Sequence, residues 1–200
     1  TLTETGADTG IFQGSIALSV GGTSSADGVL AASLGDTLTI TYEDTANAIG
    51  IPETLTSTAL LVGSKVTGTI SADTTWSATT SPYLVTGDVT VATEKTLTVE
   101  SGVRVLFESG SDGESSGEWS DRAELIIDGT LTAESSTSTN PIVFTSVNPS
   151  NSSDQWGAIR FTEGSSGSLK NCEINKGKYG IYAYGGSASV SVDNCIVSNN

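Results

Sequence analysis

Five carboxylates lie close together in one polar segment of the chain. The segment ESGSDGESSGEWSD contains Glu108, Asp112, Glu114, Glu118 and Asp121 among Gly and Ser residues. Calcium accepts roughly six to eight oxygen ligands, which a loop of this composition can supply. The segment does not match the EF-hand pattern, and charge-rich Gly and Ser loops also occur as solvated insertions. The sequence therefore predicts a calcium site at these five residues, with a solvated insertion as the alternative.

Other carboxylates are candidates for the catalytic groups of an enzyme that cleaves sugar chains. Glycoside hydrolysis needs two converging carboxyl groups, and lyase chemistry on acidic sugars needs a base. Asp154, Glu163 and Glu173 fall on different turns of the later part of the chain, the three arginines are scattered, and there is no His. We therefore predict no catalytic residue, no enzymatic activity and no cofactor besides calcium. A polysaccharide lyase or hydrolase remains the alternative if the native chain continues.

Aromatic side chains form a third group of candidates, since flat rings can bind sugars. In the segment around residue 182, Tyr182 and Tyr184 project to the same side of their predicted strand. In the repeat described next they align with Ile159 and Phe161, so we expect them in the core. Sugar binding stays open for Trp76, Trp119, Trp156 and Tyr179.

The elements that position these residues follow from an internal repeat. Two segments, 157–174 and 180–197, repeat at an offset of 23 residues, with Gly157 on Gly180, Ile159 on Tyr182, Phe161 on Tyr184, Leu169 on Val192, Asn171 on Asn194, Cys172 on Cys195 and Ile174 on Val197. A self-repeat of roughly 20 to 30 residues indicates a solenoid, whose units bury apolar faces only by stacking.

The type of solenoid follows from the local pattern. Apolar and polar residues alternate in short runs separated by Gly, Ser and Asn clusters, and no run has helical spacing. This pattern favours a parallel β-helix, beginning near Tyr83. Asn171 and Asn194 are expected to stack in its turns, where Asn tolerates left-handed backbone.

The cysteines lie one repeat apart, so Cys172 and Cys195 are expected at equivalent positions of adjacent rungs. Strands lie about 4.8 Å apart, whereas disulfides prefer Cβ atoms about 3.8 Å apart. Stacked free thiols and a strained disulfide both remain open.

The order of these motifs resembles a known family. The runs SPYLVTGDVTVATEKTLTVESGVRVLF, AELIIDGTLTAE, NPIVFTS, WGAIRF, LKNCEI and VDNCIVSNN resemble the right-handed parallel β-helix (pectate-lyase-like solenoid) domains of bacterial and archaeal surface proteins. The first part, TLTETGADTGIFQGSIALS and GVLAASLGDTLTITYED, resembles immunoglobulin-like β-sandwich repeats. The resemblance implies a fold more than an activity, because such β-helices include polysaccharide-active enzymes, adhesins and structural spans.

The predicted fold class is therefore all-β, with an N-terminal antiparallel β-sandwich-like domain followed by a right-handed parallel β-helix. We place the sandwich at 1–70, a connector or cap at 71–82 and the β-helix at 83–200. Strands at 55–61 and 65–70 either complete the sandwich, or a strand of another chain does.

Composition and architecture together predict the function. The chain has 23 Asp and Glu against 8 Lys and Arg, and Lys65 is its first basic residue. This charge repels nucleic acid and anionic membranes, so we expect neither as a partner. We predict an extracellular or cell-surface structural protein: a scaffold or self-assembling subunit of an S-layer, sheath or filament, with head-to-tail self-association. The alternative is a carbohydrate-binding or polysaccharide-degrading protein, with surface polysaccharide as partner.

Overall fold

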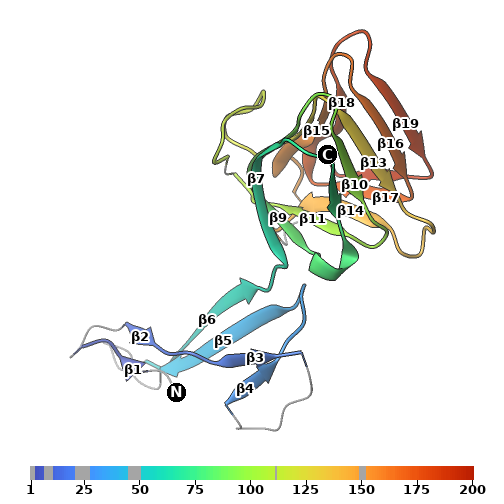
Figure 1. The fold of residues 1–200 in the computed structure, drawn as a ribbon. Coiled ribbons are helices and arrows are strands. Elements are labelled where there is room, and N and C mark those ends of the chain that lie inside the picture. Colours follow the sequence, from blue (N-terminus) through green and yellow to red (C-terminus); the bar gives the residue numbers. More distant parts are fainter. Residues whose placement is uncertain (1–2, 7–10, 21–27, 45–50, 111, 149–151) are drawn as a thin grey trace. The chain divides into compact units, whose positions relative to one another are not determined.

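The chain folds into strands, with one short 3₁₀ helix, η1 (Ala78–Thr80). The computed structural model describes residues 3–6, 11–20, 28–44, 51–110, 112–148 and 152–200. Two compact units are present, Thr1–Leu61 and Val62–Asn200, coloured from blue to red along the chain in Figure 1. The predicted all-β class is confirmed. Within the described residues, no helix is long and apolar enough to cross a membrane.

The second unit is a stack of parallel strands in three columns. The first half of β9 (Tyr83–Val91) belongs to one column, which continues through β11 (Arg104–Phe107), β14 (Ile142–Ser146), β17 (Cys172–Asn175) and β20 (Ile196–Ser198). The second half of β9 belongs to another, with β12 (Leu125–Ile127), β15 (Trp156–Phe161) and β18 (Gly177–Ala183). The third contains β8 (Thr74–Trp76), β10 (Thr96–Val99), β13 (Thr130–Glu134), β16 (Ser166–Lys170) and β19 (Ser189–Asp193). Every pairing is parallel, so the predicted parallel β-helix is confirmed.

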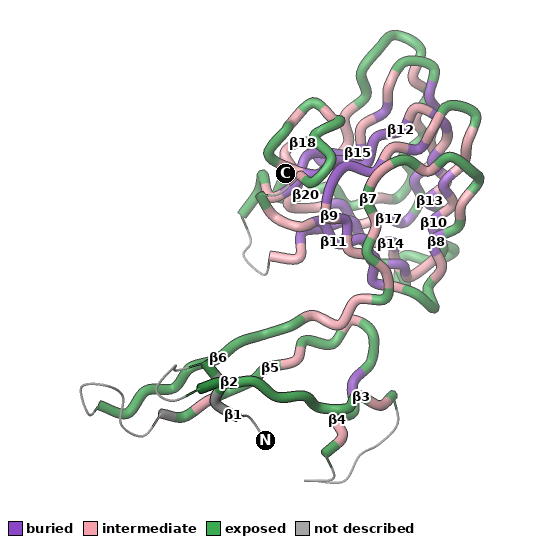
Figure 2. Tube along the Cα trace, turned by 60° about the vertical axis from the view of Figure 1, so that its left-hand side comes forward, coloured by how far each residue is buried: buried purple, intermediate pink, exposed green. Residues whose placement is uncertain are grey.

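The core follows from the alternation of side chains along each strand. In the third column Val99, Ala133 and Leu169 occupy successive rungs at one register position, and all three are buried. Figure 2 shows the buried residues in purple along the interior of the solenoid. Phe107 and Trp156 stack inside it with ring centroids 4.0 Å apart. Burial of such side chains supplies the main stabilisation of the stack.

The turns confirm the predicted asparagine ladder. Asn171 and Asn194 both have a φ of 50°, in the left-handed region. The side-chain amide of Asn194 donates a hydrogen bond to Oδ1 of Asn171 one rung away. The side-chain amide of Asn171 in turn donates to the backbone oxygen of Ser135, so the polar corner is bonded between rungs.

The cysteines stack as the repeat predicted. The backbone N–H of Cys172 donates to Sγ of Cys195 at 3.4 Å. Both are free thiols, Cys172 buried and Cys195 half-buried. Burial, and then the neighbouring Cys195, raise the pKa of Cys172 to about 12, which keeps it protonated at neutral pH.

The 23-residue offset predicted from the repeat is wrong for one pair of strands. In the pair β15 and β18, Ile159 lies opposite Ile181 and Arg160 opposite Tyr182, an offset of 22 residues, after a register shift between Trp156 and Ala158. The offset returns to 23 between β16 and β19, where Leu169 lies opposite Val192. Because a slip of one residue moves a strand's side chains to the opposite face, the prediction that Tyr182 and Tyr184 lie in the core is wrong.

The domain boundaries also differ from those expected. Strand β7 (Ser64–Ile70), assigned to the sandwich, pairs in parallel with β9 and belongs to the solenoid. The expected connector contributes β8, which pairs with β10, and its Trp76 is buried. These segments belong to the stack because their backbone groups pair with rungs. The first unit accordingly ends at Leu61 rather than at residue 70.

The first unit contains part of the predicted sandwich, as separate strand pairs. Two pairs are antiparallel, β5 (Thr37–Asp44) with β6 (Glu53–Leu60) and β1 (Thr3–Glu4) with β2 (Phe12–Gln13). The pair β3 (Ala17–Ser19) and β4 (Val29–Ala31) is parallel, not antiparallel as expected. Of the two strands expected to complete the sandwich, β6 pairs with β5 in this unit, and β7 pairs with β9 in the solenoid.

The burial of the core predicts that the same substitution lowers the free energy of unfolding by different amounts in two neighbouring rungs. Ile174 is fully buried in β17, whereas Ile196 in β20 is 60% exposed. Ile174→Ala should lower the free energy of unfolding by about 2–5 kcal/mol, because it leaves a cavity. Ile196→Ala should cost well below about 1 kcal/mol. Tryptophan fluorescence during urea denaturation reports the solenoid, since Trp76, Trp119 and Trp156 all lie in it. An equal loss of unfolding free energy in the two variants would contradict the burial of Ile174 in the core.

Candidate functional site

Four aromatic side chains gather on the outer surface of the second column. We call Trp119, Tyr179, Tyr182 and Tyr184 the aromatic patch. The rings of Trp119, Tyr179 and Tyr182 have centroids 5.5 to 5.8 Å apart, and the ring of Tyr184 lies 6.4 Å from that of Tyr182. Tyr179 is 53% exposed and Tyr184 60% exposed. Isolated exposed apolar residues are ordinary, but a cluster of exposed rings indicates a binding surface.

The patch is built from two elements distant in sequence. The tyrosines belong to β18 and its end, and the register with β15 turns Tyr182 outward opposite Arg160. Trp119 comes from the loop of residues 108–124, between β11 and β12, and packs against Gly157 of β15. A Cβ atom on Gly157 would lie 3.0 Å from Cε3 of Trp119 and 2.5 Å from Cγ of Glu124. Glycine at this position lets the loop approach the strand.

Two buried carboxylates hold this loop against the solenoid, and the sequence analysis missed both. Asp88 and Glu124 are fully buried at neighbouring positions in successive rungs, and the backbone N–H of Glu124 donates to Oδ1 of Asp88 at 2.8 Å. Oδ2 of Asp88 accepts hydrogen bonds from the backbone N–H groups of Ser116 and Gly117 and from the Ser116 hydroxyl. Oε2 of Glu124 accepts the backbone N–H groups of Glu118 and Trp119. The loop backbone thus supplies the donors that these charges need.

Burial nevertheless leaves these carboxylates costly to ionise. Desolvation is the largest influence on the pKa of both Asp88 and Glu124 and raises it, although the backbone donors oppose the shift. Oε1 of Glu124 is buried without a hydrogen-bond partner, as is Oδ2 of Asp112. An unsatisfied buried polar atom costs about 1–3 kcal/mol. Strong hydrogen bonds therefore hold the loop, although one carboxylate oxygen of Glu124 and one of Asp112 stay without a partner.

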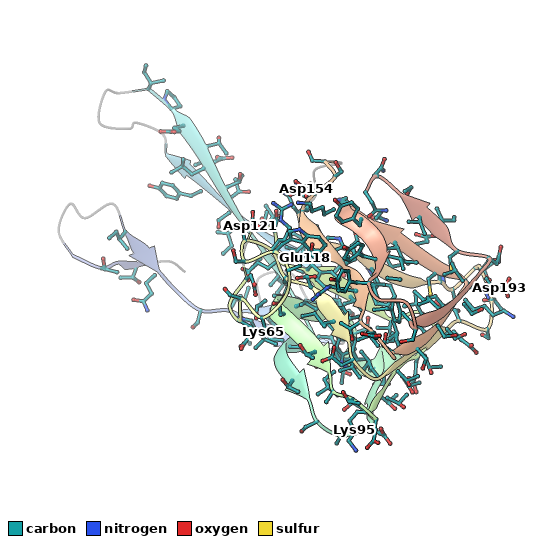
Figure 3. The ribbon with its side chains drawn as sticks, turned by 90° about the horizontal axis from the view of Figure 1, so that it is seen from above. Lys65, Lys95, Glu118, Asp121, Asp154 and Asp193 are labelled. Carbon is teal, nitrogen blue, oxygen red and sulfur yellow. The ribbon has the colours of Figure 1, made fainter. Side chains whose placement is uncertain are left out.

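A charged rim borders the patch, formed by Glu118, Asp121 and Asp154 with Arg122 and Arg160. Arg122 pairs with Asp121 at 2.8 Å and also with Asp154, and Nε of Arg160 lies 3.7 Å from Oε2 of Glu118. Figure 3 shows the three carboxylates on the same part of the solenoid. The hydrogen bond from Arg122 lowers the pKa of Asp121. Lys178 lies over the ring of Trp119, with Nζ 5.3 Å from its centroid.

The five residues of the predicted calcium site face different partners. Glu108 is half-buried directly after β11, and Oδ1 of Asp112 accepts the backbone N–H groups of Asp88 and Glu114. The side chain of Glu114 accepts a hydrogen bond from the Thr67 hydroxyl at 3.2 Å. Glu118 and Asp121 pair with arginines of the rim. Across the part of the chain that the structure describes, no three or more potential ligand side chains are grouped to hold a metal ion. Calcium binding stays a prediction.

The remaining sequence candidates separate into core and surface. Trp76 and Trp156 are 3% and 0% exposed, so neither ring is available to a sugar. Glu173 lies on β17 in the first column, and Glu163 follows β15 beside Gly185. Asp154 belongs to the charged rim. The structure thus brings one of these three carboxylates to the patch. An outward-facing strand that is unusually rich in Tyr was the available sequence signal for the patch.

A parallel solenoid with exposed aromatic rings on one column defines the class of this protein as a β-helix protein. Comparison with known families agrees with the fold. The family model described as a pectate-lyase like beta helix domain matches residues 68–195, well over half of the chain. The chain therefore belongs to this family. No curated protein matches the chain, and no solved structure does.

The buried carboxylates predict a specific pH dependence. Because the pKa of Glu124 is raised above its ordinary value of 4.5, the folded protein takes up this proton before the unfolded chain does as the pH falls. Its ionisation therefore destabilises the fold at neutral pH, and that penalty disappears as the pH falls through the raised pKa. Glu124→Gln removes this contribution, so its stability relative to wild type should be highest at pH 7 and decrease towards pH 4. Urea denaturation followed by tryptophan fluorescence measures the difference. A difference independent of pH would show that Glu124 ionises as freely as in the unfolded chain.

Proposed function

We propose that this β-helix is a non-catalytic, glycan-binding segment of an extracellular scaffold, and that the aromatic patch is its binding surface. The observation that carries the proposal is the cluster of Trp119, Tyr179, Tyr182 and Tyr184. Sugar rings present apolar C–H faces that pack on aromatic rings, and tyrosine hydroxyls can donate to or accept from sugar hydroxyls. The side chains of the rim carboxylates supply further acceptors.

The rigidity of the support favours binding by this surface. Tyr182 is carried by a strand paired in register with β15, and Trp119 by a loop tied to Asp88 and Glu124 through four backbone N–H groups. Side chains already held in place lose little conformational freedom when a ligand binds. A polysaccharide can therefore be bound by few contacts.

Binding is better supported than cleavage. A general acid must hold a proton near neutral pH, yet the pKa of Asp121 is lowered by Arg122. Asp88 and Glu124 have raised pKa values, which is typical of catalytic acids. Both are fully buried beneath the loop, where no glycosidic oxygen can reach them. Their hydrogen bonds to the loop backbone support a positioning role instead.

An extracellular location fits the same proposal. Domains of the pectate-lyase-like β-helix type are often secreted or surface-associated, and the net charge of −15 favours an exposed, solvated surface. A scaffold that displays a glycan-binding column would attach a surface structure to surrounding polysaccharide. The family includes enzymes, so the non-catalytic role is part of the proposal.

Substitution of the exposed rings tests the proposed surface. A glycan array with the intact chain identifies a retained polymer, and calorimetry then measures affinity. Tyr179→Ala and Tyr182→Ala should each weaken binding about tenfold, since such a loss corresponds to about 1.4 kcal/mol for a buried aromatic contact. Tyr179→Phe keeps the ring and should keep most of the affinity. Absence of any retained glycan at high protein concentration, or full affinity in both Ala variants, would refute the proposal.

A second candidate function, self-association, is favoured by the first unit. Among the residues of this unit whose burial the structure describes, Ala32 alone is buried, as the largely green unit in Figure 2 illustrates. Large apolar side chains are exposed instead: Ile11, Ile16, Leu18, Val20, Leu30, Leu34, Ile40, Ile51 and Leu55. A sheet with one uncovered apolar face is commonly covered by a second layer. We propose that a second copy of the chain supplies that layer.

Light scattering at increasing protein concentration tests this assembly. The intact chain should form dimers or larger polymers, which electron microscopy would distinguish. Ile40→Glu should shift the population towards monomer, because Ile40 is 58% exposed on β5 and the new charge would be buried in the contact. Thr39→Glu places the same charge on the opposite face of the strand and should leave assembly unchanged. A monomer at all concentrations would exclude self-association.

A further inference from the structure

We infer that the aromatic patch selects neutral polysaccharides and disfavours polymers with acidic groups. This inference rests on the proposed glycan binding and adds the chemical class of the ligand. It is carried by the way in which the rim orders its charges: the cationic groups lie inside, and the carboxylates face solvent.

The exposures within each ion pair establish this order. The side chain of Arg122 is 16% exposed, whereas its partners Asp121 and Asp154 are 67% and 52% exposed. The side chain of Arg160 is 18% exposed, and its partner Glu118 is 42% exposed. A ligand that approaches the patch therefore meets carboxylate oxygens before it meets either guanidinium group. Arg122 already donates hydrogen bonds to Asp121 and Asp154, so an anionic sugar binding there must break an existing ion pair. Nε of Arg160 has no hydrogen-bond partner and lies 3.7 Å from Glu118, but it is buried.

Lys178 does not reverse this arrangement. Its ammonium group lies over the face of Trp119, where the ring's electron density attracts it. It also contributes to the lowered pKa of Asp121, so its field already acts on a rim carboxylate. An acidic ligand would thus compete with both Trp119 and Asp121 for this cation.

The long-range field acts in the same direction. The chain carries a net charge of −15, which repels a polyanion at low ionic strength. Near physiological salt, interactions between exposed charges are screened beyond about 8 Å, so the rim carboxylates beside the rings then dominate. Neutral hydroxyl groups meet no such penalty, and they can donate hydrogen bonds to the rim carboxylates. Rings flanked by exposed acceptors suit an uncharged polyol chain.

A matched pair of polymers tests the inference with the intact protein. The first is a neutral polysaccharide retained on the array, and the second is the same polymer oxidised at C6 to the uronate. Affinity electrophoresis or calorimetry in chelator and at low salt should show at least about tenfold weaker binding of the oxidised polymer, with a smaller difference in high salt. Chelation prevents divalent cations from bridging the ligand to the rim.

The possible outcomes separate this inference from the proposed function. If the oxidised polymer binds as tightly as the neutral one or tighter, and Tyr179→Ala weakens binding of both, glycan binding stands and neutral selectivity is refuted. A preference for a free amino-sugar polymer over its N-acetylated form would likewise show selection of cations rather than of neutral chains. If no polymer of any charge is retained, both proposals fail.

One rim substitution provides the matched variant. Asp121→Asn removes an exposed charge beside the patch and should narrow the ratio between the neutral and oxidised polymers about two- to threefold, as expected for one partly screened charge. Asp193→Asn removes a charge paired with Lys170 at another edge of the solenoid, labelled in Figure 3, and should leave the ratio unchanged. An equal ratio in wild type and both variants would show that the rim does not set the selectivity.

Discussion

The register of β18 on β15 decides what this protein presents to its surroundings. Parallel strands bury every second side chain, so an offset of 22 instead of 23 residues places Ile181 over Ile159 and turns Tyr182 outward opposite Arg160. The same local shift occurs near Gly157, where the absence of a Cβ lets Trp119 and Glu124 pack against the strand. This one irregularity in the stack thus creates the exposed rings and the space for the loop that completes them.

The loop of residues 108–124 shows how charge can be used to organise backbone. Its Gly- and Ser-rich composition gives it no apolar side of its own, and it is instead held by Asp88 and Glu124, whose carboxylates accept backbone N–H groups from Ser116 to Trp119. The desolvation that raises both pKa values is partly offset by these donors. Charged groups at this position fix the loop conformation more than they add to stability, since burying them carries a large penalty.

The sequence was sufficient to predict the solenoid, the asparagine ladder and the stacked cysteines, because these depend on repeated residue types at equivalent turns. It was insufficient for the patch, since one inserted residue within a strand reverses the orientation of the side chains while the apolar count of the repeat stays the same. The loop carboxylates illustrate a second limit. Glu118 and Asp121 attract attention as neighbours in sequence, whereas the groups that organise the loop, Asp88 and Glu124, become neighbours only when rungs stack. The strand 64–70 was assigned to the sandwich for a similar reason: the residues of a strand do not show which other strand it pairs with, and here the partner is β9.

The position of the patch follows from how a β-helix divides its residues. Inward positions are constrained by the rungs above and below, but an outward column is free to vary unless another segment covers it. In the outward column of Thr90, Ile126, Arg160 and Tyr182, Ile126 is only 4% exposed. On the same early rungs the loop is bonded to Asp88 and Glu124. Arg160 is paired with Glu118 of the loop, and Tyr182 follows it in the column with its ring against Trp119. The place where the loop meets this column therefore combines rigid support, exposed rings and a charged rim, a combination that neither the bare solenoid nor the loop provides alone.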